Sequence, residues 1–145
     1  MLCNNAYRTD YVEAARAQIA GSVDAFRTMA AAADRDLALR DAVAAFEPTF
    51  FNSLVLALDS HFTHRGRTVE GKDGNPANEV RVLCSSLTEN GGVLLADKGI
   101  KLRAADSVLG LEPGDPIAIR ADDFERLADG FFAVIEERFT AAVPG

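Results

Sequence analysis

The residues that could carry chemistry gather in one polar stretch, residues 59–81, with the sequence DSHFTHRGRTVEGKDGNPANEVR. His61 and His64 lie three residues apart, so a helix would bring both imidazole rings to one side. With Asp59 or Glu70 as a further ligand, such a pair could bind a metal ion. Because the spacing is common in packed helices and fixes no third ligand, we interpret both histidines as structural and assign no metal.

The same stretch contains a candidate anion site. Arg65, Arg67 and Lys72 supply positive charge, and Asn75 followed by Pro76 is typical of the start of a helix. Free backbone N–H groups at a helix start attract phosphate and carboxylate groups. The other interpretation is a well-capped loop in which Arg65 forms a salt bridge with a nearby acid.

Two of these polar residues are expected to need partners. On a helix, His61 and Arg65 would lie on the same side as the apolar residues Leu54 and Leu58. Burying such groups unpaired would cost about 1–3 kcal/mol. The candidate partners are Asp59, Glu70, Asp73 and Glu79.

A nuclease is a further hypothesis, in which a histidine transfers a proton and an arginine stabilises phosphate charge. The helical layout resembles that of small bacterial nucleases of the HEPN type, whose usual motif is an arginine followed a few residues later by a histidine. Neither His61 nor His64 has an arginine at that position. The signatures of P-loops, dinucleotide sites, EF-hands, serine hydrolases and zinc proteases are also missing from the sequence. Enzymatic activity therefore stays undecided at this point.

Composition narrows the classes of partner. A net charge of −7, from 22 acidic and 15 basic residues, opposes attraction to nucleic acid and to anionic lipid, so neither is expected. Apolar runs such as FFNSLVLAL fall short of the ~20 residues that span a bilayer, and the first residues do not resemble a signal peptide. Cys3 and Cys84 lie far apart and suggest no disulfide framework. We expect a cytoplasmic protein with reduced thiols.

Helices must position the polar stretch. Apolar residues at spacings of three and four predict a first helix over residues 10–33 and a second over 34–46. Pro48 favours a break before a central core helix that runs from Thr49 to about Arg65.

Two more helices are expected towards the end of the chain. One begins at Asn75 and Pro76 and ends near Gly91, and the last covers residues 122–139 after a capping-box pattern. Phe132 lies away from the centre of the last helix's apolar face, which predicts an exposed aromatic ring.

Between the helix that ends near Gly91 and the last helix, the apolar residues no longer follow helical spacing. VLLAD and IKLR, separated by Lys98-Gly99, are typical of a β-hairpin, and SVLGL and PIAI suggest further short strands. We therefore predict a small antiparallel β insert at about residues 92–119. Such a ribbon is marginally stable alone, so it should pack on the bundle or on another subunit.

The predicted fold class is mainly α. It is an antiparallel bundle of four or five helices with a small antiparallel β insert before the last helix, in a single domain of residues 1–145. The motif EGKDGNPANEVR, followed by SVLGL, GDPIAI and a closing aromatic helix, resembles a family of uncharacterised bacterial proteins over about residues 46–139. This resemblance implies a bacterial, cytosolic protein and carries no activity with it.

These features favour a noncatalytic ligand- or partner-binding or regulatory module without a cofactor. Its predicted ligand-binding residues are His61, His64, Arg65, Arg67, Lys72, Asn75 and Glu79. The expected partners are a small anionic ligand or another protein, and alanine-rich helix faces together with the β insert favour a homodimer. The alternative is a HEPN-like ribonuclease or a metal-dependent hydrolase that uses His61 or His64 for proton transfer.

Overall fold

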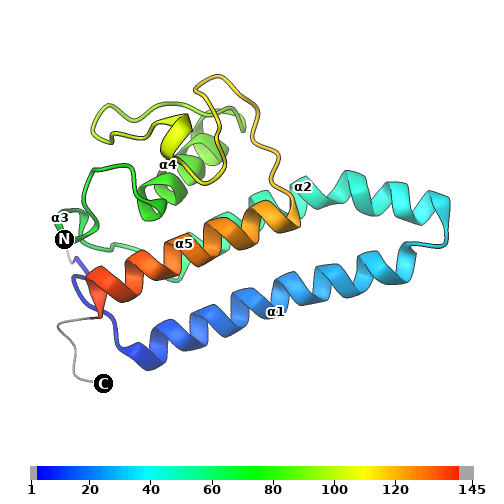
Figure 1. Ribbon diagram of the computed structural model, residues 1–145, viewed down its shortest axis with the longest axis horizontal. Coiled ribbons are helices and arrows are strands. Elements are labelled where there is room, and N and C mark those ends of the chain that lie inside the picture. Colours follow the sequence, from blue (N-terminus) through cyan, green and yellow to red (C-terminus); the bar gives the residue numbers. More distant parts are fainter. Residues whose placement is uncertain (1–2, 141–145) are drawn as a thin grey trace.

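The computed structural model describes residues 3–140, which form five α-helices joined by irregular segments (Figure 1). The helices are α1 (Thr9–Ala33), α2 (Leu37–Ser60), α3 (Arg67–Glu70), α4 (Pro76–Glu89) and α5 (Ala121–Phe139), with a 3-10 turn η1 at Ala104–Asp106. α1 and α2 form a long antiparallel hairpin, α5 packs against both, and α4 packs against α2 and α5. The prediction of a mainly helical protein with packed helix pairs is confirmed.

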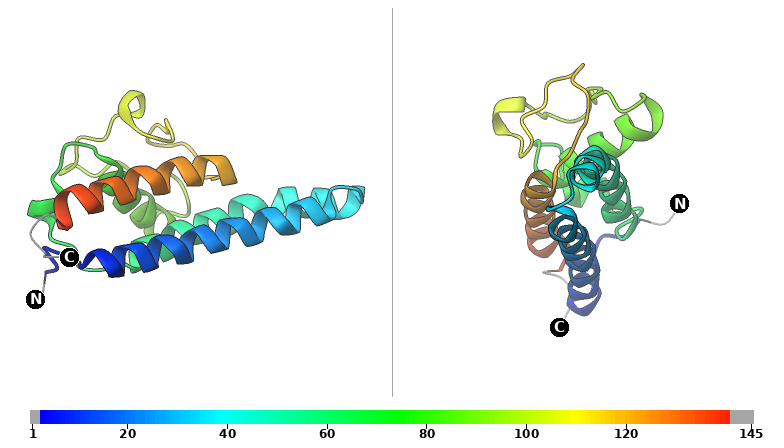
Figure 2. Two further views of the ribbon diagram at one scale, coloured as in Figure 1. Left: turned by 60° about the horizontal axis from the view of Figure 1, so that its bottom comes forward. Right: turned by 90° about the vertical axis from the view of Figure 1, so that its right-hand side faces the viewer.

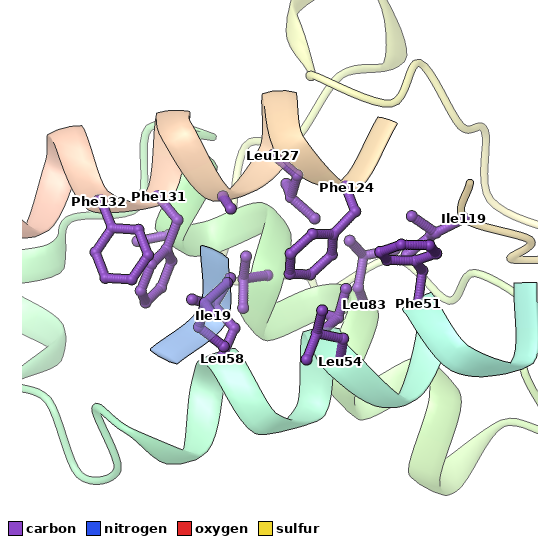
Figure 3. Close-up of a cluster of buried hydrophobic side chains, with 14 of the residues drawn as sticks. Ile19, Phe51, Leu54, Leu58, Leu83, Ile119, Phe124, Leu127, Phe131 and Phe132 are labelled. Atoms are coloured by element: carbon purple, nitrogen blue, oxygen red, sulfur yellow. The ribbon is translucent and has the colours of Figure 1, made fainter. Parts of the chain in front are cut away.

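The hydrophobic core lies between α2, α4 and α5, with α1 closing one side (Figure 3). Leu54 and Leu58 of α2 point towards Phe124 and Phe131 of α5. Buried apolar side chains recur along both helices at spacings of three and four, which places them on the face of each helix that meets the core. Burial of apolar side chains on this scale is the main force that holds the helices together.

Phe132 corrects the prediction of an exposed aromatic ring. Its side chain is almost fully buried, with its ring edge-on to Phe62 and beneath the guanidinium of Arg16, whose Cζ lies 4.6 Å from the ring centroid. The prediction considered one apolar face on the last helix. Because α5 is covered by α1 as well as by α2 and α4, it buries a second face.

α2 also differs from the prediction, because it continues through Pro48 without a break. Proline has no N–H, so the carbonyl of Ala44 lacks its usual helical donor. Ala44 is exposed, so water can satisfy that carbonyl. On either side of the proline α2 is joined to α5, since the ring of Phe51 packs against that of Phe124 with centroids 5.5 Å apart, and the carboxylate of Glu47 accepts the N–H of Ala121.

The predicted β insert at about residues 92–119 is wrong, since the described part of the chain contains no strand. A single antiparallel bridge joins Val93 to Pro116, flanked by a 2.8 Å bond from the Ile117 N–H to the Gly92 carbonyl. A ladder cannot grow through Pro116 because it has no N–H to donate. The segment remains an irregular connection that runs over α4 and descends to the start of α5 (Figure 1).

Helix side chains take the place of the missing sheet. Asn52 of α2 donates to the carbonyl of Ile117 at 2.8 Å and accepts the N–H of Ile119 at 3.1 Å. Ser86 of α4 accepts the N–H of Leu95 at 3.0 Å. The backbone groups that a strand partner would have bound are therefore bound by helices, which satisfies them without a second strand.

The far end of the α1–α2 hairpin extends beyond the other helices (Figure 2). Arg27 of α1 pairs with Asp122 at 2.7 Å, and Glu47 of α2 binds Ala121, so both helices are tied to the start of α5 at these positions. We call residues 28–46, which lie beyond these ties, the hairpin tip.

α2 has an unusual combination of apolar composition and exposure. Among the described helices it is the one whose length and hydropathy would allow it to cross a membrane, a test that core helices of soluble proteins also pass. Only 22% of its most apolar window of 18 residues is buried, however. Within α2 the buried residues begin at Phe51, so the first half of the helix has none.

Candidate functional site

The polar stretch begins where α2 ends. The predicted helix through Arg65 stops at Ser60, with His61 as its C-cap. The chain then turns through His64, at φ 60°, and pairs with the N-terminal segment, where the Asn4 N–H donates to the His64 carbonyl at 2.8 Å and the Gly66 N–H donates to the Asn4 carbonyl at 2.7 Å. This pairing places Arg65 in the interior rather than at the end of a helix.

Arg65 is fully enclosed by partners. Its Nε lies 2.5 Å from Oε1 of Glu70, its Nη1 lies 2.6 Å from Oδ1 of Asp59, and its Nη2 donates to the carbonyl of Ala77 at 3.1 Å. The guanidinium also lies 5.2 Å above the ring of Phe131. The expected salt bridge between Arg65 and nearby acids is therefore present, and it is buried.

The carboxylate of Glu70 also accepts hydrogen bonds from Arg81 and Asn78. Arg81 forms a bidentate contact with its two carboxylate oxygens, at 3.0 and 2.8 Å, and Asn78 donates to Oε2 at 2.6 Å. Burial alone would raise the pKa of Glu70, but the Arg81 hydrogen bond and the charges of Arg65 and Arg81 outweigh it and lower the pKa below its usual value. Glu70 is therefore held as a carboxylate.

We call Asp59, Arg65, Glu70, Asn78 and Arg81 the polar network. It joins the end of α2, the short α3 and the first turns of α4, which are separate segments of the chain. Its buried donors and acceptors are paired with one another, so the network can rigidify this end of the fold. A substrate would have to displace these contacts to reach Arg65 or Glu70.

The loop before α4 is held by its turn residues. Asn75 accepts the N–H groups of Ala77 and Asn78 at 2.9 and 3.2 Å, so the predicted N-cap is confirmed. Gly74 adopts φ 86°, and a Cβ there would lie 2.4 Å from the carbonyl oxygen of Lys101. Glycine is required at this position by both the conformation and the close approach.

Arg138 of α5 fastens the loop from the other side. Its Nη1 donates to the carbonyl of Glu70, and its Nη2 lies 3.2 Å from Oδ2 of Asp73. Hydrogen bonds from Asn75 and Arg138 lower the pKa of Asp73 to about 2. The loop is therefore joined to the last helix by an ion pair at its edge.

Glu79 binds the backbone of the long connection. Its carboxylate accepts the N–H groups of Val108 and Leu109 at 2.8 and 2.9 Å, and its side chain is buried. Burial raises the pKa of Glu79, against the opposing effect of the two amide hydrogen bonds. The residue thus holds the connection in place from within α4.

The two histidines lie apart from this network. His61 is half-buried and its carbonyl accepts the hydroxyl of Tyr11, whereas His64 is exposed. Within residues 3–140, neither imidazole ring has a hydrogen bond or ion pair with another side chain, and no three histidine, cysteine or acidic residues are grouped so as to hold a metal ion.

One open hollow adjoins the polar stretch. It measures about 370 Å³ and is lined by Arg67, Thr68, Lys72, Asp97 and Gly99. Arg67 and Asp97 lie 3.9 Å apart, a loose contact between two largely exposed side chains. The Lys101 N–H donates to the Lys72 carbonyl at 2.9 Å, which brings the two segments that form the hollow together.

The seven predicted site residues are therefore divided among three places. Arg65, Asn75 and Glu79 make structural contacts, Arg67 and Lys72 face the hollow, and the histidines lie elsewhere.

The sequence prediction missed Asn78, Arg81 and Arg138. The first two are three residues apart on α4, so their common side could have been predicted. Arg138 lies 68 residues from Glu70 in sequence, and no local pattern connects them.

Comparisons of the chain with protein-family models, with curated proteins and with solved structures find no match.

Proposed function

We propose that this protein is a noncatalytic binding or regulatory module of the bacterial cytoplasm, which binds a small anion beside Arg67 and Lys72 and acts as a homodimer. The observation that carries the anion site is the open hollow, in which both cations face solvent. A general acid or base must be free to reach its substrate. Arg65 and Glu70 are instead occupied by their partners, which favours binding over catalysis.

The chemistry of the hollow suits a phosphate or carboxylate group. Arg67 can present two N–H groups to an oxyanion, Lys72 adds a second positive charge, and the Thr68 hydroxyl can donate a hydrogen bond. Asp97 is the one acid that lines the hollow, and its 3.9 Å separation from Arg67 leaves the guanidinium open to a better partner. The lining therefore carries one more positive than negative charge.

The charge of the whole chain supports a small ligand rather than a polyanion. A net charge of −7 repels nucleic acid and anionic lipid at long range, while a single small anion meets mainly the local cations. Cys3 and Cys84 are both free, in keeping with a reducing compartment such as the cytoplasm.

Calorimetric titration with inorganic phosphate, and separately with citrate, tests the site. Charge-assisted hydrogen bonds contribute about 1.5–3 kcal/mol each, so Arg67→Gln and Lys72→Gln should each weaken binding at least about tenfold. Arg8→Gln removes the same charge from an exposed ion pair elsewhere and should leave binding unchanged. Equal affinity in all three variants would overturn the anion site.

The enzymatic alternative makes a different prediction. A ribonuclease or metal-dependent hydrolase that uses His61 or His64 would cleave RNA or a phosphoester, and His61→Ala or His64→Ala would abolish that cleavage. We expect purified wild-type protein to show no such activity, with or without added Zn²⁺ or Mn²⁺. Cleavage by the wild type that disappears in either variant would refute the noncatalytic assignment.

A further inference from the structure

The hairpin tip exposes apolar side chains that the rest of the fold does not cover. Met29 of α1 and Leu37, Leu39 and Phe46 of α2 are 41%, 64%, 54% and 44% exposed. Two helices alone can bury only the strip between them, and here Ala33 is the buried residue of the tip. Helices in proteins gain most of their stability from packing, so a pair this exposed lacks much of that support.

The exposed residues continue a packing stripe that begins in the core. Leu39, Val43, Phe46 and Phe50 follow one another at spacings of four, three and four, which places them along one side of α2. At its inner end, Phe50 stacks on Phe26 of α1 with ring centroids 5.5 Å apart, and Phe46 lies 5.9 Å from Phe50. Val43 and Phe50 of this stripe pack against the core, whereas Leu39 and Phe46 stay about half exposed.

The charges of the hairpin tip favour a second copy of the same chain as the partner that covers its apolar side chains. They are Asp34, Arg35, Asp36, Arg40 and Asp41. Their sum is −1, so two tips repel each other far less than two whole chains of −7. Because this short segment carries both arginines and aspartates, a two-fold arrangement can pair arginines of one copy with aspartates of the other, as a self-complementary interface requires.

A lipid bilayer is a less suitable partner for the hairpin tip than a second copy of the chain. The turn between α1 and α2 carries Asp34, Arg35 and Asp36, which would have to enter the bilayer first. A charged side chain at the centre of a bilayer costs about 2.5–3.5 kcal/mol even on the most permissive scale. The apolar residues are therefore better matched by a protein surface that leaves this charged turn in water.

We infer that the hairpin tip is the interface of a homodimer, in which a second copy packs its own tip antiparallel across Leu39, Val43 and Phe46. The four helices of the two tips then form a short bundle that buries the exposed surfaces of Leu39 and Phe46 in each copy. This inference rests on the homodimer of the proposed function and names its surface, which is independent of the anion hollow.

Sedimentation equilibrium and native mass spectrometry across the micromolar range test the interface. The wild type should have twice the 15.5 kDa mass of one chain. Leu39→Glu and Phe46→Glu should each raise the dimer dissociation constant at least about tenfold, because each buries a charge in the interface. Leu95→Glu alters a residue that is 58% exposed in the long connection, and the variant should remain a dimer.

Hydrogen exchange provides a readout that does not depend on the variants folding alike. Amides of residues 37–46 should exchange more slowly as wild-type concentration rises, and this change should be lost in Leu39→Glu, while amides of α4 and α5 should not respond.

The outcomes separate the possible failures. A wild type that stays monomeric at high micromolar concentration overturns both the homodimer and its interface. A dimer that persists in Leu39→Glu and Phe46→Glu keeps the homodimer and overturns the tip as its surface. Monomeric protein that cosediments with neutral phosphatidylcholine vesicles, and loses this binding in the same two variants, would instead assign the tip to a membrane.

Discussion

Arg65 and Glu70 form an ion pair in the interior of the protein, with Nε and Oε1 2.5 Å apart and both side chains no more than 2% exposed. Taking two charges out of water costs several kcal/mol for each, so such a pair persists only when further hydrogen bonds complete it. Asp59, Asn78 and Arg81 supply those bonds here. The pair therefore joins the end of α2, α3 and the first turns of α4 by polar contacts, beside the apolar core that α2 and α4 already share.

Glu70→Gln should destabilise the fold strongly. The substitution keeps the shape of the side chain but removes the charge that faces Arg65 and Arg81. We expect the free energy of unfolding to fall by about 3 kcal/mol, near the low end for a broken buried pair, because Asp59 still pairs with Arg65. Urea unfolding measures this change. Asp10→Asn breaks an exposed pair with Arg8 at the start of α1 and should lower the unfolding free energy far less than Glu70→Gln does, and equal effects of the two substitutions would contradict a structural network.

Because of Asp73, the free energy of unfolding should depend on pH. Its pKa is about 2 in the folded protein and 3.8 ordinarily, so the folded state favours the carboxylate. The resulting stabilisation is present above about pH 4 and is lost as the pH falls towards 2. Urea midpoints measured over this window should converge for the wild type and Asp73→Asn at the acid end. Asp129→Asn, on the exposed side of α5, should run parallel to the wild type, and a constant gap between wild type and Asp73→Asn would refute the assignment.

Glu79→Gln should loosen the long connection without unfolding the helices. A glutamine has an NH2 group in place of one carboxylate oxygen, so the N–H of Val108 or of Leu109 would face a donor where it now has an acceptor. The loss should cost about 1–3 kcal/mol and speed hydrogen exchange at these two amides. Glu89→Gln, an exposed change on the same helix, is the matched control. Unchanged exchange at both amides in Glu79→Gln would show that the connection is held by other contacts.

The two thiols should react very differently. Cys3 is exposed, whereas burial, with a smaller effect of the Asp59 charge, raises the pKa of Cys84 to about 12. Since the thiolate is the reactive form, iodoacetamide near pH 8 should add one group to the folded chain and two in urea. Mass spectrometry with peptide mapping identifies the modified residue, and rapid labelling of Cys84 in the folded protein would contradict its burial.

Sequence patterns predicted the features that depend on neighbouring residues. The cap formed by Asn75 and Pro76 and the apolar periodicity of residues 10–33 are local signals, and the helices they predicted are present. Arg65 was expected to need an acidic partner, and Asp59 and Glu70, both within six residues of it, supply one. Such features depend on residues close together in sequence, which sequence patterns describe.

The features that were missed depend on segments distant in sequence. The strands predicted over about residues 92–119 have suitable apolar residues, but Asn52 and Glu79 bind their backbone groups instead. The helix expected to reach Arg65 stops earlier because the chain there pairs with Asn4. Apolar periodicity describes which face is buried, and it cannot report which helix will supply a hydrogen bond.

Pro48 lies two residues beyond the hairpin tip, at the point where α2 leaves the body of the protein. The missing hydrogen bond to the Ala44 carbonyl makes this the turn of α2 with the least resistance to bending. The neighbouring ties of Arg27 and Glu47 to the start of α5 anchor the body side of that turn. The tip can therefore bend relative to the body at this turn, and in the homodimer that we propose such bending would change the angle between the two bodies while each core stays rigid.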